Sequence, residues 1–412
     1  MAGVTDQALR ARAKRVIPGG MYGHQSVRHL PPNTPQFFAR AEGAYLWDAD
    51  DQRYLDLMCA YGPNLFGYGQ ETVDEAYIAQ LKSIDVGTGP TPLMVDLAEQ
   101  FTDLVSHAHW AIFCKNGTDA TSMALMAARA HAGKRKVLVA QGAYHGAANW
   151  CTPMPAGTVP EDRAHLIQYE YNSVESLRAA AAAAGDDLAG IFASPFKHDV
   201  LVNQQAPEPA YAQAARALCD EQDALLIVDD VRAGFRIARD CSWSALGIEP
   251  DLSSWGKAIA NGHPLSALLG NDRARAAAES LYVTGSYWFA GAAMAASLAT
   301  LKLIRDTGYL EHTIAMGQAL RDGLQGIADE HGLGISQTGP VQMPLIMFDQ
   351  ADGTRDMALG SAFAAGMIDR GVYVHPFHNM FISAAVTDAD IAAALDAAAA
   401  TARALPSQVQ AG

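Results

Sequence analysis

A lysine that follows a glycine and precedes a turn is the clearest candidate for chemistry in this sequence. Lys257 lies in DLSSWGKAIANGHPLSALLG, after Gly256 and before a glycine-containing turn and a buried apolar run. Burial lowers the pKa of a lysine, and the neutral amine is a nucleophile toward aldehydes. A surface lysine in a loop is the commoner situation for a single residue of this kind, so the hypothesis depends on the partners of Lys257.

Two acids end a buried strand that the sequence predicts before this lysine. In ALLIVDDVRAGFR, Asp229 comes first after the apolar run and Val231 follows two residues later. Open α/β sheets bind ligands at the carboxyl ends of their strands. A carboxylate there can pair with a protonated ring nitrogen, and Val231 can pack on the ring face. Metal binding is the alternative role for Asp229, but no second cluster of acids or histidines at ligand spacing supports it.

A turn that runs into a helix is a candidate site for a phosphate. In CKNGTDATSMALMAARA, Gly117, Thr118 and Asp119 stand at the predicted start of the helix. Backbone N–H groups and the helix dipole favour an anion at such a start, although a capped helix without a ligand is the simpler interpretation. The segment lacks the GxxxxGK[ST] pattern of nucleotide-binding loops, and no strand is followed by GxGxxG.

Two aromatic segments complete the set of candidate residues. In GAYHGAANW, Tyr144 can stack on a flat ring, and His145 can bond to the edge of that ring or to a neighbouring acid. TGSYWFAG adds hydroxyl groups and glycine that can hold an anion. A single buried aromatic is more often part of a core. The combination of a lysine, an acid, an anion-binding helix start and a stacking aromatic is far more specific than any member.

The elements that must position these residues follow an α/β pattern between about residues 90 and 300. Short apolar runs without alternation recur there and alternate with helical patterns; they are AIFC, KVLVA, AGIFAS, ALLIVDD and LSALLG. Such runs are typical of strands buried on both faces of a mostly parallel sheet. The alternation with helices predicts a layered α/β domain flanked by helices.

The two ends of the chain show different patterns. GAYLWDADDQRYLDL alternates apolar and polar residues around an Asp-Asp turn, which predicts a β-hairpin. A long helix over residues 310–331 precedes PLIMFD and GVYVHP, and a final helix starts near Thr387, which together predict a smaller α+β domain. We therefore expect an N-terminal segment over residues 1–60 that packs with the small domain, a large domain over 61–305 and the small domain over 306–412.

The composition excludes several classes of function. The chain has 412 residues, a formal net charge of -15 and a sequence pI near 5.2, whereas nucleic-acid binding needs a basic surface. No apolar run reaches the ~18 residues that span a bilayer, and the N-terminus has no apolar signal segment. The five cysteines are scattered and lack the spacing of metal ligands. We therefore expect reduced thiols, as in a cytoplasmic protein, and no metal site.

The order of the motifs resembles that of class III, fold-type-I aminotransferases over nearly the whole chain, and in particular their glutamate-1-semialdehyde aminomutase-like branch. The matching stretches are RVIPGG, GAYLWDADDQRYLDL, NGTDAT, AYHG, VDDVRAGFR, EPDLSSWGKAIANGHP, MAASLATL and GVYVHP. The resemblance implies a large domain with a mostly parallel sheet and a smaller α+β domain. It also implies pyridoxal 5'-phosphate (PLP) as the cofactor.

The resemblance also implies a role for each candidate residue. By motif, the Schiff-base lysine falls on Lys257, the pyridine-nitrogen aspartate on Asp229 and the ring-packing valine on Val231. The stacking aromatic falls on Tyr144 beside His145. The phosphate-holding backbone falls on Gly117 and Thr118, and Asn116 before them is a further cofactor-binding position. A hydroxyl from the partner subunit that reaches the phosphate falls on Ser286, where threonine is usual. This implies a homodimer with shared active sites.

Three positions differ from the usual pattern of the family. Asn116 replaces a serine, Asp230 replaces a glutamate, and Ser194 replaces a glutamate near the pocket. The aminomutases carry a long gating segment after the Tyr-His-Gly motif, but here only residues 147–166 separate that motif from the next strand. An open lid lets the oxidised product leave, which favours ping-pong transamination between an amine donor and a keto acid such as pyruvate.

Four further stretches are similar to the hydrolysed-fumonisin type of aminotransferase, which deaminates a long amino-polyol with pyruvate as acceptor; they are RVIPGGMYGH, MCAYGPNLFGYG, DCSWSALGIEPDLSSWGK and VHPFHNMFISAA.

Arg28 matches a family position that binds a substrate carboxylate, a task that suits a guanidinium, and a surface arginine is an equal alternative. The residues expected in an apolar pocket wall are Tyr61, Trp150, Tyr287 and Trp288.

Other functions remain open at this point. An aminomutase that acts on one substrate, a β-amino-acid aminotransferase and a racemase are compatible with the same motifs. A cofactor-bearing regulatory protein is the alternative outside enzymes. It is disfavoured because the sequence has no DNA-binding module, basic patch or heptad segment.

Overall fold

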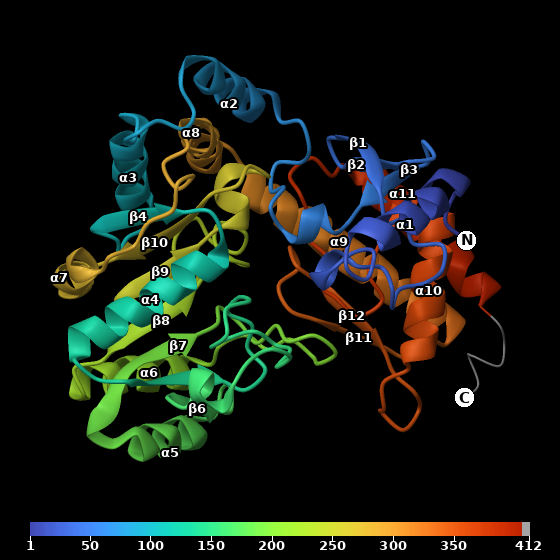
Figure 1. Cartoon of the computed structure of the whole chain (residues 1–412). Helices are drawn as coiled ribbons and strands as arrows, with labels where there is room; N and C mark the ends of the chain where they lie inside the picture. Colours follow the sequence, from blue (N-terminus) through green and yellow to red (C-terminus); the bar gives the residue numbers. More distant parts are fainter. Residues whose placement is uncertain (406–412) are drawn as a thin grey trace. The chain divides into compact units, whose positions relative to one another are not determined.

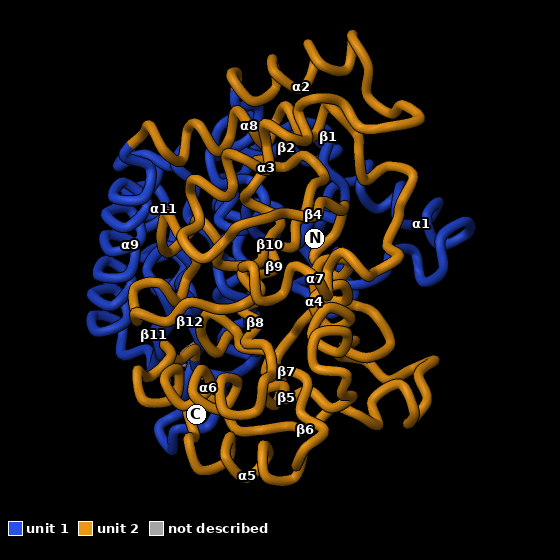
Figure 2. The backbone as a smooth tube through the Cα atoms, turned by 90° about the vertical axis from the view of Figure 1, so that its left-hand side faces the viewer, with its two compact units in different colours: residues 1–70, 200–203, 308–412 blue, residues 71–199, 204–307 orange. Residues whose placement is uncertain are grey.

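The computed structural model describes residues 1–405, which form two compact units (Figures 1 and 2). Unit 1 takes residues 1–70, 200–203 and the chain from residue 308 onward, and unit 2 takes residues 71–199 and 204–307. The N-terminal segment and the C-terminal region, expected as residues 1–60 and 306–412, thus belong to the same unit.

Unit 2 is built on a seven-stranded sheet in the order β4-β10-β9-β8-β7-β5-β6. Its strands are β4 (Trp110–Cys114), β5 (Lys136–Ala140), β6 (Leu166–Tyr169), β7 (Leu188–Ala193), β8 (Leu225–Asp229), β9 (Leu252–Trp255) and β10 (Ser266–Gly270). Strands β5 to β9 pair in parallel, whereas β10 is antiparallel to both β9 and β4. The expected mostly parallel sheet is confirmed.

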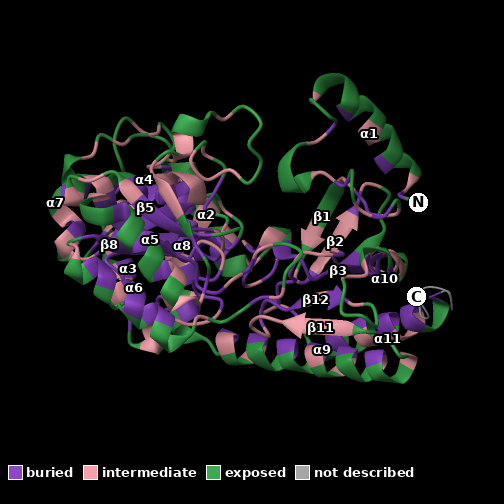
Figure 3. Ribbon diagram, turned by 90° about the horizontal axis from the view of Figure 1, so that it is seen from below, coloured by how far each residue is buried: buried purple, intermediate pink, exposed green. Residues whose placement is uncertain are grey.

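Helices flank this sheet. They are α2 (Glu71–Ser83), α3 (Leu93–Leu104), α4 (Gly117–Ala132), α5 (Val174–Ala184), α6 (Pro209–Glu221), α7 (Asp272–Ser280) and α8 (Gly291–Asp306). Helix α4 packs across β7 to β10, while α5 and α6 contact β5 to β8. Strands β7 to β10 are buried along their whole lengths, and the apolar runs predicted all of them except β9. Helices α3 and α6, by contrast, also carry exposed residues (Figure 3).

Unit 1 contains two small sheets and four long helices. The first sheet has the order β1-β2-β3-β13, and the second pairs β11 with β12. The strands are β1 (Phe38–Glu42), β2 (Tyr45–Asp48), β3 (Arg53–Asp56), β11 (Ile335–Thr338), β12 (Leu345–Phe348) and β13 (Val372–Tyr373). The helices are α1 (Val4–Val16), α9 (Tyr309–His331), α10 (Met357–Asp369) and α11 (Asp388–Ala404). Strands β2 and β3 form the expected antiparallel hairpin.

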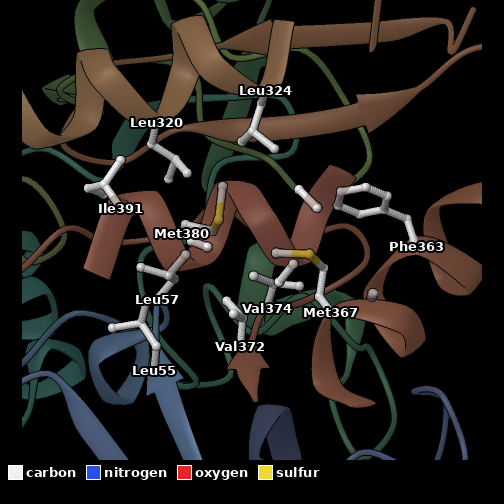
Figure 4. Packing of buried hydrophobic residues seen from close by; sticks show 14 of the residues in the cluster. Leu55, Leu57, Leu320, Leu324, Phe363, Met367, Val372, Val374, Met380 and Ile391 are labelled. Atoms are coloured by element: carbon white, nitrogen blue, oxygen red, sulfur yellow. The ribbon is translucent and has the colours of Figure 1, made fainter. Parts of the chain in front are cut away.

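The core of unit 1 joins segments that are far apart in the sequence. Leu55 and Leu57 from the hairpin region pack with Leu320 of α9, Met367 of α10 and Val374 beyond β13 (Figure 4). Burial of aliphatic side chains of this size contributes about 1.5–3 kcal/mol each. In this core the N-terminal segment therefore packs against the C-terminal helices. No helix within residues 1–405 is both long enough and apolar enough to cross a membrane.

Candidate active site

Lys257 lies just beyond the end of β9 in a strained backbone conformation. Its φ of 51° is in the left-handed region, which residues other than glycine rarely adopt and which is concentrated at functional sites. The preceding Gly256 is required by close packing, because a Cβ atom there would lie 2.7 Å from the Oγ atom of Ser266. These contacts fix the position at which the lysine side chain leaves the backbone.

The surroundings of Lys257 favour the neutral amine. Part of the residue remains accessible, but protein packs closely around the amine, and this burial lowers its pKa to about 7. The positive charges of Arg232 and Arg236 act in the same direction, and the negative charge of Asp229 opposes them. A large share of the amine is thus neutral near pH 7, and the neutral amine is the form that attacks aldehydes.

Asp229 ends β8 and forms a buried pair with His145. The Nδ1 atom of His145 donates to Oδ2 of Asp229 at 2.7 Å, and both side chains are almost fully buried. The backbone N–H of Val231 donates to the other carboxylate oxygen at 3.2 Å. Asp229 is thus an acid partner of the kind expected for His145.

Several groups hold the ring of His145 in place. The hydroxyl of Thr121 donates to the His145 carbonyl at 2.7 Å, and the Trp150 ring stacks on the imidazole with a centroid distance of 6.3 Å. Phe192 packs against both rings, and the indole N–H of Trp150 donates to Ser122. Trp150, which was expected in the wall of a pocket, thus packs against the imidazole ring of His145.

The start of α4 approaches Val231. A Cβ atom on Gly117 would lie 2.6 Å from a methyl group of Val231, so only glycine fits at the first position of the helix. The backbone N–H of Asn116 donates to the carboxylate of Asp119 at 3.0 Å, and the hydroxyl of Thr118 accepts from the N–H of Ala147 at 3.1 Å. The predicted helix start, the ring-packing valine and the loop after His145 therefore lie together.

The remaining aromatic candidates are more exposed. Tyr144 is 40% exposed, and Tyr287 is 68% exposed in a segment that also contains the exposed Ser286. Trp288 is partly buried and packs against the core of unit 2. The candidates of this segment thus differ in their surroundings, with two facing solvent and one packed inward.

Two predicted residues belong to unit 1. The guanidinium of Arg28 donates to the carbonyl of Gly19 at 3.0 Å and is otherwise exposed. Tyr61 lies in a left-handed turn with a φ of 62° and contacts the rings of His24 and His378.

Two residues near Lys257 were not among the candidates named from the sequence. Arg232 donates to the carbonyl of His198 at 3.2 Å, and its charge is the largest neighbouring charge that lowers the pKa of Lys257. His198 is buried, and burial lowers its pKa well below the usual value. Arg232 stands three residues after Asp229 in the same motif. This short spacing could have identified Arg232 from the sequence as a residue near the site.

These residues fit a flat, anionic ring cofactor. Within unit 2 the residues present are an amine of lowered pKa, a buried carboxylate, and a helix start whose glycine leaves the backbone open. The Nε2 atom of His145 has no hydrogen-bond partner in the part of the chain that the structure describes, so the histidine serves the carboxylate alone. Across the same residues, no three His, Cys, Asp or Glu side chains are grouped to hold a metal ion.

Comparisons with known proteins agree with this chemistry. The model of the family "Aminotransferase class-III" matches residues 27–401. The chain is 56% identical to the aminopentol aminotransferase of Sphingopyxis macrogoltabida over 395 residues, 96% of this chain and 93% of that protein. It is 34% identical to the glutamate-1-semialdehyde 2,1-aminomutase of Albidiferax ferrireducens, over 95% of this chain and 96% of that one.

The solved structures include a close match. The PLP internal aldimine form of the FumI protein of Sphingopyxis sp. MTA144 superposes with a TM-score of 0.96 at 55% identity, covering 98% of this chain and 96% of the other. The chain therefore belongs to the class III aminotransferases. It is a PLP-dependent transferase of fold type I, as its motifs implied.

Proposed function

We propose that this enzyme moves the amino group of a long-chain, hydroxylated amine to a small keto acid such as pyruvate, in two half-reactions. The observation that carries the proposal is the amine of Lys257, with a pKa of about 7, in the unit that also holds Asp229 and the start of α4. The identity of 56% with an aminopentol aminotransferase supports the class of amine.

Each group near Lys257 has a distinct task in this proposal. When bound, PLP supplies an aldehyde that captures the amine and a ring that accepts an electron pair from the donor carbon. The Nζ atom of Lys257 removes the proton from the donor carbon and returns a proton to the acceptor carbon in the second half-reaction. Asp229 holds a proton on the ring nitrogen, and His145 fixes the direction of that carboxylate.

Other residues would bind the cofactor without moving protons. Gly117 and Thr118 would offer backbone N–H groups to the phosphate at the start of α4, and Asn116, whose own N–H donates to Asp119, would adjoin it. Tyr144 and Val231 would pack against the faces of the cofactor ring. The close approach of Gly117 to Val231 supports this assignment, because both would contact one ligand.

The substrate-binding residues are a further part of the proposal. We assign Arg28 to the carboxylate of the keto acid, because its guanidinium can bind both oxygens. The apolar wall of the pocket is assigned to Tyr61, Trp150, Tyr287 and Trp288. The variant Arg28→Gln should raise the KM for pyruvate about tenfold without changing the rate of the amine half-reaction; an unchanged KM would remove Arg28 from the site.

The active form is proposed to be a homodimer in which Ser286 of one copy completes the site of the other. Exposed apolar side chains on and near α2 and α3 support a large interface; they are Ile78, Leu81, Ile84, Val86 and Val95. Tyr287, next to Ser286, is also exposed. Sedimentation at micromolar concentration should give twice the mass of the chain.

A mixing experiment tests whether the sites are shared. Lys257→Ala and Ser286→Asp should each be inactive or weak alone. If Ser286 acts across the interface, a mixed dimer contains one site with both native residues, and activity returns on mixing. If Ser286 serves its own chain, neither site of the mixed dimer is intact and no activity returns.

The choice of substrates is tested with a panel of amines in the presence of pyruvate or 2-oxoglutarate. We expect ketone formation from hydroxylated long-chain amines only when a keto acid is present. An aminomutase is the second candidate, supported by the 34% identity with that enzyme, and would need no keto acid. In Lys257→Ala the turnover and the visible absorbance of the lysine-bound cofactor should both be lost, and retained absorbance would refute the role of Lys257.

A further inference from the structure

The chain over residues 257–264, which we call the lysine loop, is strained at more than one position. It begins with a short 3₁₀ helix, Lys257–Ala260, and ends just before β10. Lys257 has a φ of 51°, and Asn261 and Gly262 have φ values of 42° and 97°. Residues other than glycine keep such a conformation only where surrounding contacts over-determine it. The contacts that hold the lysine loop therefore also hold the backbone of Lys257.

The middle of the lysine loop is bonded to helix α8. The hydroxyl of Ser297 donates to the carbonyl of Ile259 at 2.8 Å, and both residues are fully buried. Loss of this bond would leave a buried carbonyl unpaired, which destabilises a fold. The middle of the loop is thus part of the core of unit 2.

The end of the lysine loop is bonded to helix α2. The Nε2 atom of His263 donates to Oδ1 of Asp74 at 3.0 Å. The imidazole also stacks on the ring of Tyr77, with a centroid distance of 4.2 Å and an interplanar angle of 18°. Asp74 and Tyr77 are three positions apart in one helix, so they lie on the same side of it. Two side chains of α2 thus contact one imidazole of the loop.

A second contact holds the next residue of the loop. The Nζ atom of Lys115 donates to the carbonyl of Pro264 at 2.9 Å, and Lys115 directly precedes Asn116, the residue that caps α4. The end of the lysine loop is therefore bonded both to α2 and to the residue before the start of α4. All of these residues belong to unit 2.

The bond between His263 and Asp74 is partly open to solvent. Their side chains are 21% and 42% exposed. Pairs of this kind contribute little to the stability of a protein, because water competes for both partners. The pair can therefore be removed with the fold intact, although it bonds directly to the loop that carries Lys257. Its place in the structure is better explained by the position that it gives to the loop than by stability.

We propose that His263, held by Asp74 and Tyr77, is a positioning residue for Lys257. This inference rests on the proposed role of Lys257. With the imidazole bonded to α2, the lysine loop keeps Lys257 in its left-handed conformation and its amine enclosed by protein. Without this bond the loop relaxes, the backbone of Lys257 moves toward the favoured right-handed conformation, and water reaches the amine.

The test follows capture of PLP by the full-length protein from which the cofactor has been removed, measured by visible absorbance over a range of pH. His263→Phe keeps a ring on Tyr77 but loses the donor to Asp74. A more hydrated amine has a higher pKa, so the midpoint of capture should rise by about one pH unit. Capture at pH 7 should then slow about fivefold, since less of the amine is neutral.

Variants of Asp74 test the same bond from the other partner. Asp74→Ala removes the acceptor and should move the midpoint as His263→Phe does. Asp74→Asn still offers an oxygen to Nε2 of His263, so its rate of capture should stay within about twofold of the wild type. The charges of Arg232, Arg236 and Asp229, which also act on the amine of Lys257, are the same in all three variants.

A second histidine pair of unit 2 provides the matched control. Nε2 of His131 lies 3.3 Å from Oδ1 of Asp223, in the last turn of α4. His131→Phe should leave the midpoint of capture unchanged. A lower unfolding temperature with an unchanged midpoint in His263→Phe and Asp74→Ala would show that the pair serves the fold alone, and would overturn the proposal. If His263→Phe does not fold, Asp74→Ala, at the more exposed partner, decides the question.

Lys257→Ala separates a failure of this inference from a failure of the proposed function. Visible absorbance retained in Lys257→Ala would refute the proposed role of Lys257 itself. If Lys257→Ala loses the absorbance while His263→Phe and Asp74→Ala behave as the wild type, the proposed function stands and only the positioning role of His263 fails.

Discussion

The Nδ1 atom of His145 lies 2.7 Å from Oδ2 of Asp229, although the two residues are 84 positions apart in the sequence. The carboxyl end of β8 and the loop after β5 meet there, because both strands run in the same direction within one parallel sheet. The backbone N–H of Val231 donates a hydrogen bond to the second carboxylate oxygen of Asp229. Two hydrogen bonds thus orient the carboxylate of Asp229.

The first prediction concerns this pair. His145→Phe keeps a ring against Trp150 but removes the donor to Asp229, and a hydrogen bond to a charged group contributes about 1.5–3 kcal/mol. The affinity for PLP should therefore fall by about 10- to 100-fold, measured by titration of the visible absorbance. An unchanged affinity would mean that the pair serves folding alone.

Asp229→Asn tests the carboxylate itself. The amide oxygen can still accept from His145, so the unfolding temperature should stay within a few degrees of the wild type. The ring nitrogen would lose its charged partner, and the first half-reaction should slow by about 100-fold or more, the scale on which one electrostatic contact acts in catalysis. Stopped-flow absorbance measures this rate. A loss below about threefold would contradict the role assigned to Asp229.

The fold was largely predictable because most strands of unit 2 are continuous apolar runs. Strand β6, half-exposed at the edge of the sheet, was expected after residues 147–166 although it lacks a long apolar run. Strand β9 was not predicted. Strand β9 is fully buried but contains Ser253, whose hydroxyl is satisfied by His107 and by the indole of Trp255. A pattern that counts apolar residues cannot detect a buried serine with distant partners.

The site was predictable in part for the same physical reason. Asp229 ends a strand that its apolar run predicted, so the rule that ligands bind at strand ends pointed to it from local sequence. Lys257 was selected because it follows Gly256 and precedes a turn and a buried apolar run. The stacking of Trp150 on His145 and the rings around Tyr61 depend on tertiary packing. His378 comes from a segment more than 300 residues away, and no spacing in the sequence records that contact.

Gly117→Ala tests the close approach at the start of α4. The new methyl group would lie 2.6 Å from Val231, and overpacking of this kind costs about 1–3 kcal/mol. Thermal unfolding should show the loss, together with weaker binding of PLP. Gly326→Ala in α9 is the matched control, since a Cβ atom there meets nothing within 4 Å. It should stabilise the helix by about 0.5–1 kcal/mol. Equal shifts in both variants would argue against a tight contact at Gly117.

The last prediction follows from the pKa of about 7 at Lys257. Only the neutral amine attacks an aldehyde, so capture of PLP by the apoprotein should accelerate about tenfold per pH unit from pH 5 and level off above pH 7. Arg232→Gln removes a positive charge that disfavours the protonated amine, so the pKa should rise and the midpoint should move to higher pH. Arg239→Gln, which alters an arginine absent from the groups that shift this pKa, should leave the midpoint unchanged. A midpoint near 10 in the wild type would show that the amine is not perturbed.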